Sequence, residues 1–269
     1  MKKSGIILAL FFCNYFCFSQ ANDTIYFNYF DNPPFATIDS GKTKGLEIDI
    51  MNEYLLWLKA AKKITATPKY IGFKDFDKFY NSTKIGTKNT MGLGSVAINP
   101  ERLKEVDFSP AYLKSVVNCV TSGNAPDIKT KTQNEIIKAL GVMTAVTVSN
   151  TTLNIYVNEL KKNYLPDLKI LFQPNGKKIL DDIAKNVLYF GFVDEITFWY
   201  YVKNNPYRFV KVQKPLVQTK EEFGFVLPKN SGQKALFAEF FLTFKKTKNY
   251  MFILEKHLGT YMSKTLAVI

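Results

Sequence analysis

Apolar and polar positions along the chain follow two alternating patterns. One has the spacing of a helix face, as in Ile50, Met51, Tyr54, Leu55 and Leu58, with Asp49 available as a cap. The other is a strand-length apolar run, and such runs cover residues 24–30, 91–97, 116–121, 140–144, 169–172, 188–193 and 223–227. Helical spacing returns over residues 152–162 and 178–186. Strands alternating with helices predict βαβ units, mostly parallel sheets and an α/β fold.

The C-terminal region places aromatic residues at helical spacing. A first helix carries the stripe Leu236, Phe237, Phe240, Phe241 and Phe244, and a second carries Tyr250, Ile253 and Leu254. We interpret both stripes as core packing, because apolar residues on one helix face usually face the protein interior.

The N-terminus has the layout of a secretory signal peptide. Lys2 and Lys3 precede an apolar run over residues 6–12, and small residues follow at Ser19 and Ala21. The run is too short to span a bilayer of about 30 Å as a helix. We therefore expect residues 1–20 to be removed on export. Cys13 and Cys17 lack the small preceding residue of a lipidation site, which favours a soluble periplasmic product over a lipoprotein.

Charge and cysteine content narrow the class of protein further. The formal net charge is +13 at pH 7, but the lysines are spread along the chain, as on solvated helix faces. This spread and the expected export argue against a nucleic-acid partner. Cys119 is the one cysteine beyond the signal peptide, so no intramolecular disulfide is expected. Its apolar neighbours predict a core position.

The sequence lacks the patterns of common catalytic sites. His257 is the only histidine, which excludes histidine triads and multi-histidine metal sites. The glycines at 92 and 94 lack the spacing and lysine of a phosphate loop. The acidic pairs Asp181-Asp182 and Glu221-Glu222 are interpreted as solvated. We predict no catalytic residue, no metal and no cofactor.

Residues 91–109 contain the most specific motif. They form an apolar run, a turn at Asn99-Pro100, and the charged return ERLKEVDFS. This segment resembles the signature of the family 3 extracellular solute-binding proteins, the polar amino-acid receptors of ABC importers. Further similar stretches follow the family's order, at residues 32–35, 45–50, 141–147, 223–229 and 249–259.

The resemblance implies a type II periplasmic-binding-protein fold. In this fold each of two α/β lobes has a mostly parallel sheet flanked by helices, and a two-strand hinge joins the lobes. Residues 21–111 and 222–269 would form lobe 1, and residues 112–221 would form lobe 2. A ligand would bind in the cleft, and closure around it is favoured because both lobes then contact it.

The resemblance also implies two charged ligand anchors. Arg102 matches the arginine that binds the ligand carboxylate, and its planar guanidinium suits that geometry. Asp194, expected between a strand and a helix, matches the acid that accepts the ligand ammonium. A plain helix N-cap is the alternative role for this aspartate.

Neutral positions of the implied site depart from the family pattern. Asn32 replaces a frequent aromatic residue, which leaves Phe35 and Phe73, together with Phe30, as candidates to cover the ligand. Ser95 stands at a usual glycine, and Ala97 stands where a hydroxyl is usual. In lobe 2, Thr144 and Thr147 are candidate polar contacts, and Val148 replaces a small residue.

The resemblance therefore implies a periplasmic, monomeric solute-binding protein that captures an amino-acid-like ligand for an inner-membrane ABC permease. One alternative is a sensory or orphan binding module for another small anion or organic acid, because the neutral lining has changed. A dehydratase-like enzyme on the same fold is a further alternative, with Glu195 as its candidate acid.

Overall fold

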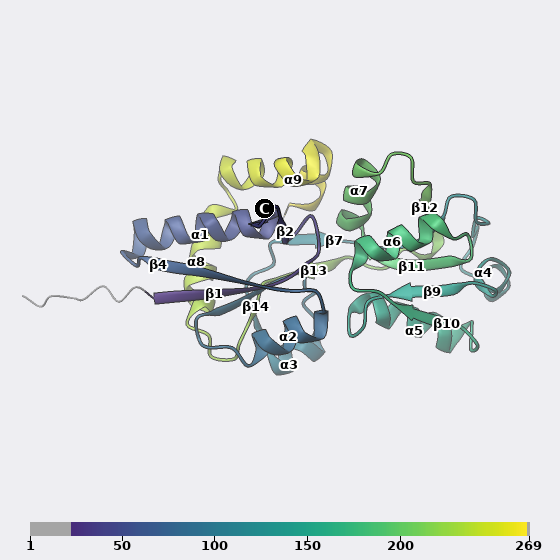
Figure 1. The fold of residues 1–269 in the computed structure, drawn as a ribbon, viewed down its shortest axis with the longest axis horizontal. Helices are drawn as coiled ribbons and strands as arrows, with labels where there is room; N and C mark the ends of the chain where they lie inside the picture. The colour runs from purple at the N-terminus through teal and green to yellow at the C-terminus, as the bar shows by residue number, and fades with distance from the viewer. Residues whose placement is uncertain (1–22, 268–269) are drawn as a thin grey trace, which may run out of the picture.

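The computed structural model describes residues 23–267, so the expected signal peptide at 1–20 lies outside the described residues. Figure 1 shows two lobes side by side, each a five-stranded sheet flanked by helices. This arrangement confirms the predicted α/β class and two-lobed fold. Within residues 23–267, no helix combines the length and apolar character needed to cross a membrane.

The sheet of the first lobe has the strand order β4-β1-β5-β14-β6. Strand β1 lies parallel to β4 and β5, while β14 lies antiparallel to β5 and β6. The strands are β1 (Asp23–Phe30), β4 (Ala66–Phe73), β5 (Thr90–Leu93), β6 (Asp107–Phe108) and β14 (Val226–Leu227). The short hairpin of β2 (Thr37–Asp39) and β3 (Lys42–Lys44) precedes the first helix.

The sheet of the second lobe has the order β10-β9-β11-β8-β12. Strand β9 lies parallel to β10 and β11, while β8 lies antiparallel to β11 and β12. The strands are β8 (Val117–Ser122), β9 (Thr144–Thr147), β10 (Lys169–Phe172), β11 (Tyr189–Asp194) and β12 (Val210–Val212).

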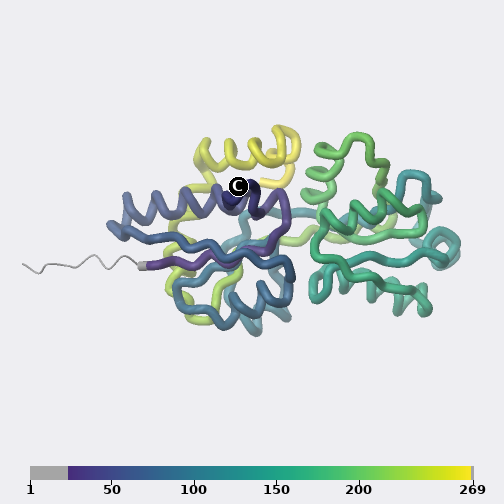
Figure 2. The backbone as a smooth tube through the Cα atoms, in the orientation of Figure 1, coloured from purple at the N-terminus to yellow at the C-terminus, as the bar shows by residue number. Residues whose placement is uncertain are grey.

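Two neighbouring segments carry the chain between the lobes, as the tube in Figure 2 shows. Strand β7 (Leu113–Ser115) leads out of the first lobe, and β13 (Glu221–Phe223) leads back into it. The two strands pair antiparallel, with Glu221 opposite Ser115 and Phe223 opposite Leu113. The division at residues 111/112 and 221/222 stays a prediction.

The helices flank the two sheets. The first lobe has α1 (Leu46–Lys62), α2 (Phe76–Lys84), α3 (Pro100–Glu105), α8 (Gln233–Phe244) and α9 (Lys248–Leu266). The second lobe has α4 (Gln133–Leu140), α5 (Thr152–Asn163), α6 (Gly176–Lys185) and α7 (Glu195–Asn204), and a 3₁₀ turn spans Lys214–Leu216. Several helices start at a side-chain cap, since Asp75, Asn99, Asn175 and Asp194 each accept an N–H from the first turn.

Several sequence predictions about elements differ from the structure. The run at 91–97 forms a strand only up to Leu93, and the run at 223–227 is divided between the end of β13 and β14. The strand expected over 140–144 begins only at Thr144, because Leu140 ends α4, whose buried face carries Ile136 and Ala139. Asp49 does not cap α1, which already begins at Leu46. Its carboxylate instead lies 2.7 Å from His257 Nε2, tying α1 to α9.

The buried side chains form three clusters. The largest lies in the first lobe and contains the C-terminal aromatic stripe. The second lies in the second lobe and contains Cys119, which is fully buried as expected, so that burial raises the pKa of its thiol. The third joins the lobes, because it contains Phe30 and Phe76 from the first and Val148 and Val193 from the second.

Candidate ligand-binding cleft

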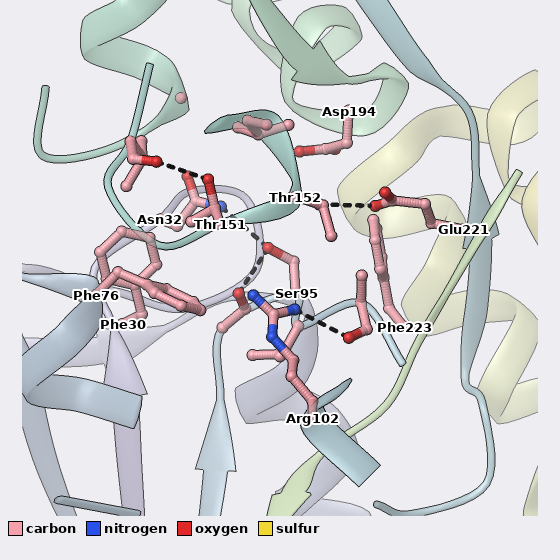
Figure 3. A pocket seen from close by; sticks show the side chains of 16 residues that line it. Phe30, Asn32, Phe76, Ser95, Arg102, Thr151, Thr152, Asp194, Glu221 and Phe223 are labelled. Atoms are coloured by element: carbon pink, nitrogen blue, oxygen red, sulfur yellow. Dashed lines mark hydrogen bonds between the residues drawn. The ribbon is translucent and has the colours of Figure 1, made fainter. Parts of the chain in front are cut away.

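A small cavity lies between the two lobes. Its volume is about 50 Å³, which is room for about four water molecules at ~10–15 Å³ each. Figure 3 shows that its polar side chains come from both lobes and from the β7–β13 ribbon. They include Asn32, Ser95, Arg102, Thr151, Thr152, Asp194 and Glu221, and the apolar wall includes Phe30, Phe76, Ala97, Val148, Leu153 and Phe223.

Arg102 lies in α3, where Asn99 and Pro100 start the helix. Its Nη1 donates to the Ala97 carbonyl over 2.9 Å, and its guanidinium carbon lies 5.3 Å from the centroid of the Phe76 ring. Burial lowers the pKa of Arg102 from its usual value. Among residues 23–267, no carboxylate lies within ion-pair distance of Arg102. Arg102 is half-buried, and a cation held there only by carbonyl groups and aromatic faces is suited to bind an anion.

Arg102 also separates the small cavity from a wider outer cleft. The outer cleft has a volume of about 560 Å³ and lies between α2 and α3 of one lobe and the start of α5 of the other. Both spaces include Arg102 in their walls. Phe76 and Thr151 also belong to both walls, so these three side chains lie between the two spaces.

Asp194 reaches the cavity from the second lobe, at the junction of β11 and α7. Its Oδ1 accepts the backbone N–H of Thr197 over 2.8 Å, and its Oδ2 accepts the Thr197 hydroxyl over 2.7 Å. The side chain is 8% exposed, and burial raises its pKa to about 6. Asp194 is therefore an N-cap that also faces the cavity. A carboxylate has about four lone-pair sites, so each oxygen can still accept a bond from a ligand.

Glu221 is a cavity residue that the sequence reasoning missed. The prediction that Glu221 and Glu222 are both solvated is wrong for Glu221, because successive residues of β13 face opposite sides. Glu222 faces solvent and pairs with Lys114 at 2.7 Å, whereas Glu221 lines the cavity. Tyr156 donates its hydroxyl to Glu221 over 2.6 Å, and Thr152 donates over 3.1 Å. Burial raises the pKa of Glu221.

Asn32 and Ser95 form the first-lobe floor of the cavity. Asn32 Nδ2 donates to Ser95 Oγ over 3.1 Å, while Asn32 Oδ1 is buried without a hydrogen-bond partner among the described residues. The Ser95 backbone N–H donates to Glu47 over 2.9 Å, so it is not available to a ligand. Burial raises the pKa of Glu47 to about 7, and Tyr112, beside the ribbon, also donates to it.

Ala97 and Val148 have apolar side chains, but their backbone carbonyl groups accept hydrogen bonds from residues of the cavity. The Ala97 carbonyl orients Arg102, and the Val148 carbonyl accepts the Thr151 hydroxyl over 2.7 Å. The first turn of α5, at Thr152 and Leu153, also lines the cavity. The N–H groups of a first helical turn have no partner within the helix, so this end of α5 is suited to an anion near Arg102.

Four predicted site residues do not line the cavity. Phe35 is fully buried and packs edge-to-face on Phe223, which itself lines the cavity, at 6.0 Å between ring centroids. Phe73 packs against Phe79 at 6.4 Å. Thr144 begins β9 at its far end, and Thr147 is fully buried with its hydroxyl unpartnered among the described residues.

The two lobes touch directly around the cavity. Asn150 Nδ2 donates to the Asp77 carboxylate over 2.8 Å, and Asn175 Nδ2 donates to the Asp31 carbonyl over 3.0 Å. Arg102 Nη2 lies 3.4 Å from the Asn150 carbonyl. These three contacts join the first lobe to the second, so the structure shows a closed arrangement. Within residues 23–267, no group of His, Cys, Asp or Glu side chains is placed to hold a metal ion.

The chain is similar to known proteins in sequence pattern and in fold. The model of the bacterial extracellular solute-binding proteins, family 3, matches residues 29–260. The chain matches no curated protein sequence.

Three solved structures illustrate the similarity of fold. An ancestral arginine-binding protein bound to arginine has 23% identity and a TM-score of 0.71, with 88% of this chain and 98% of that chain covered. An arginine-, lysine-, histidine-binding protein from Geobacillus stearothermophilus has 22% identity and a TM-score of 0.71, covering 88% and 96%. A solute receptor for L-cysteine of Neisseria gonorrhoeae has 20% identity and a TM-score of 0.71, covering 91% and 96%.

Proposed function

The chain belongs to family 3 of the bacterial extracellular solute-binding proteins, and from this premise we propose that it captures a small amino acid between its lobes for an ABC-type importer. The ligand leaves the cleft unchanged. The protein acts as a monomer in the periplasm, after removal of residues 1–20, and needs no cofactor.

The observation that carries the proposal is the placement of Arg102 and Asp194. They reach one cavity from opposite lobes, and neither forms an ion pair among the described residues. A zwitterion offers a carboxylate for Arg102 and an ammonium for Asp194, so its two charges satisfy both groups. The names of the similar structures, which include receptors for arginine and for L-cysteine, support an amino acid as the ligand class.

Closure of the lobes would link ligand binding to recognition of the protein by the permease. In this proposal the β7–β13 ribbon is the hinge, and the bonds from Asn150 and Asn175 form as the lobes meet. A ligand that contacts both lobes favours the closed form by the difference between its affinities for the two forms. An ABC permease would recognise the closed form.

A titration of purified mature protein with the standard amino acids tests the proposal. We expect at least one of them to raise the melting temperature and to give a saturable calorimetric signal, because binding to the folded state stabilises it. If no amino acid does so at millimolar concentration, the amino-acid assignment is wrong.

A small organic anion is the second candidate ligand class. It is supported by Asp194, whose two oxygens already accept from Thr197 and so have a role without an ammonium. Mass spectrometry of the ligand that co-purifies would separate an organic acid from an amino acid. An enzyme has less support, because Glu195, the candidate acid, does not line the cavity.

A further inference from the structure

The charges around the cavity do not balance. One cation, Arg102, faces two carboxylates, Asp194 and Glu221, and in the described part of the chain none of the three belongs to an ion pair. An amino acid with one ammonium and one carboxylate would neutralise Arg102 and only one of the acids. A buried charge without a counter-charge is costly, so the second carboxylate calls for another cation.

Glu221 is held in place by neutral groups only. Tyr156 and Thr152, both on α5, donate their hydroxyls to its two oxygens. These bonds fix the direction of the carboxylate but do not neutralise it, and the positive charge that acts on it, Arg102, would be shared with the ligand carboxylate. Because each oxygen has further acceptor capacity, Glu221 can also accept from a cationic donor in the cavity.

The hydrogen-bonding groups of the lining also favour a ligand with more than one ammonium, because they include several acceptors. Asn32 is 6% exposed, and its Oδ1 has no partner among the described residues. The lining residues thus carry three acceptor groups, the carboxylates of Asp194 and Glu221 and the buried amide oxygen of Asn32. A ligand ammonium carries three N–H donors, and two such groups would use these acceptors more completely than one.

We propose that Glu221 is a specificity residue that binds a second amine, so that the cleft prefers small diamino acids of net charge +1 to neutral amino acids of equal size. This inference rests on the proposed function, since it assumes that Arg102 holds an amino-acid carboxylate. The cavity of about 50 Å³ and its wall of Phe30, Phe76 and Phe223 favour a short side chain.

A matched pair of ligands tests the charge alone. 2,4-Diaminobutyrate and homoserine have the same number of heavy atoms, and they differ in a terminal ammonium against a hydroxyl. By calorimetry, we expect wild-type protein to bind the diamino acid at least about tenfold more tightly, the scale of a charge-assisted bond in a buried site. In Glu221→Gln, which keeps an acceptor for the α5 hydroxyls, the two affinities should agree within about threefold.

Glu222→Gln is the control, because Glu222 is the neighbouring acid on the same strand but pairs with Lys114 outside the cavity. This variant should keep the wild-type preference. Melting temperatures of the empty proteins report whether each variant folds.

The outcomes separate this inference from the proposed function. Equal binding of both ligands by wild-type protein overturns the role of Glu221 and leaves the amino-acid function standing. A preference that survives in Glu221→Gln, or that is lost in Glu222→Gln, also overturns it. If no amino acid binds, neutral or cationic, the proposed function fails and this inference fails with it.

Discussion

The two charged anchors of the cleft are built differently in the two lobes. Arg102, in the first lobe, is held by a carbonyl and by aromatic faces, and it forms no ion pair among the described residues. Asp194, in the second lobe, has both oxygens engaged by Thr197 at the start of α7. The guanidinium is thus available mainly for a ligand, whereas the carboxylate also holds the structure of its own lobe.

This difference separates binding from stability. Removing Arg102 removes a ligand contact and its bonds to the Ala97 and Asn150 carbonyls, while removing Asp194 removes a ligand contact and a helix cap. Variants at the two positions should therefore differ in how their losses divide between affinity for ligand and the free energy of unfolding of the empty protein.

Arg102→Ala should have the largest effect. Without the guanidinium, a ligand carboxylate would lose its charge-assisted bonds, and we expect the affinity for the best amino acid to fall by at least about 100-fold, or ~3 kcal/mol. The empty protein should lose less than about 1 kcal/mol of stability, the scale of the aromatic contacts. Calorimetry and urea denaturation measure the two quantities.

Arg208→Ala is the matched control for Arg102→Ala, because Arg208 is exposed in the second lobe and does not line the cavity. It should leave both quantities unchanged. A loss of several kcal/mol in the empty Arg102→Ala protein would instead give Arg102 a structural role.

Substitutions at Asp194 should have the next largest effect, and Asn and Ala at this position should differ in their effect on stability. Asn keeps a good N-cap but loses the charge, so Asp194→Asn should lower ligand affinity by about 10- to 100-fold with little change in stability. Asp194→Ala should show a similar loss of affinity and cost about 1 kcal/mol more in stability. If the two variants bind as tightly as wild type, Asp194 is only a cap.

A change of pH should have a smaller effect on ligand affinity than the substitutions above. Affinity should rise with pH, whereas the contribution of Asp194 to the stability of the empty protein should fall. Asp194 has a pKa of about 6 because burial disfavours its charge. An ammonium needs the ionised carboxylate, so affinity should fall by about tenfold between pH 7 and pH 5. Asp194→Asn should show a flatter profile over this range. An unchanged slope in that variant would assign the titration to another group.

For the empty protein the sign is opposite. The folded pKa of Asp194 is raised above its unfolded value of 3.8, so the stability that this group contributes is full below about pH 4 and is lost as the pH rises through 6. The difference in unfolding free energy between wild type and Asp194→Asn isolates this contribution, because the other carboxylates are common to both.

The sequence predicts those cleft residues that local motifs position, and it misses those that contacts between distant segments position. Arg102 and Asp194 stand in local contexts, after an Asn-Pro turn and between a strand and a helix, and the structure places both at the cavity. Glu221 was missed because two adjacent acidic residues are typical of a solvated surface. Which of the two glutamates faces inward is set by the pairing of β13 with β7, a contact between distant segments. Thr151 and Thr152 reach the cavity only through packing of the lobes, which no local pattern encodes.

For the fold as well, elements with strong local patterns are predicted, and an element that depends on long-range pairing is not. Strong helical and strand patterns predicted the bounds of α5, α6, β8, β10 and β11 within about two residues. Strand β4 was missed because it is an edge strand without a fully buried residue and contains Pro68. Its place in the sheet comes from parallel pairing along the whole of β1, which is a long-range contact.

The smallest effect expected is on the contact that joins the two lobes at Asn150. Asn150 has a φ of 55°, which glycine also adopts, so Asn150→Gly removes the bond to Asp77 without strain. The closed form then loses one interlobe bond, and ligand affinity should fall by about threefold, with little change in the stability of either lobe. Asn230→Gly is the control, because Asn230 has a φ of 62° in an exposed turn of the first lobe. Equal affinities in the two variants, measured by calorimetry, would mean that the Asn150 contact does not contribute to closure.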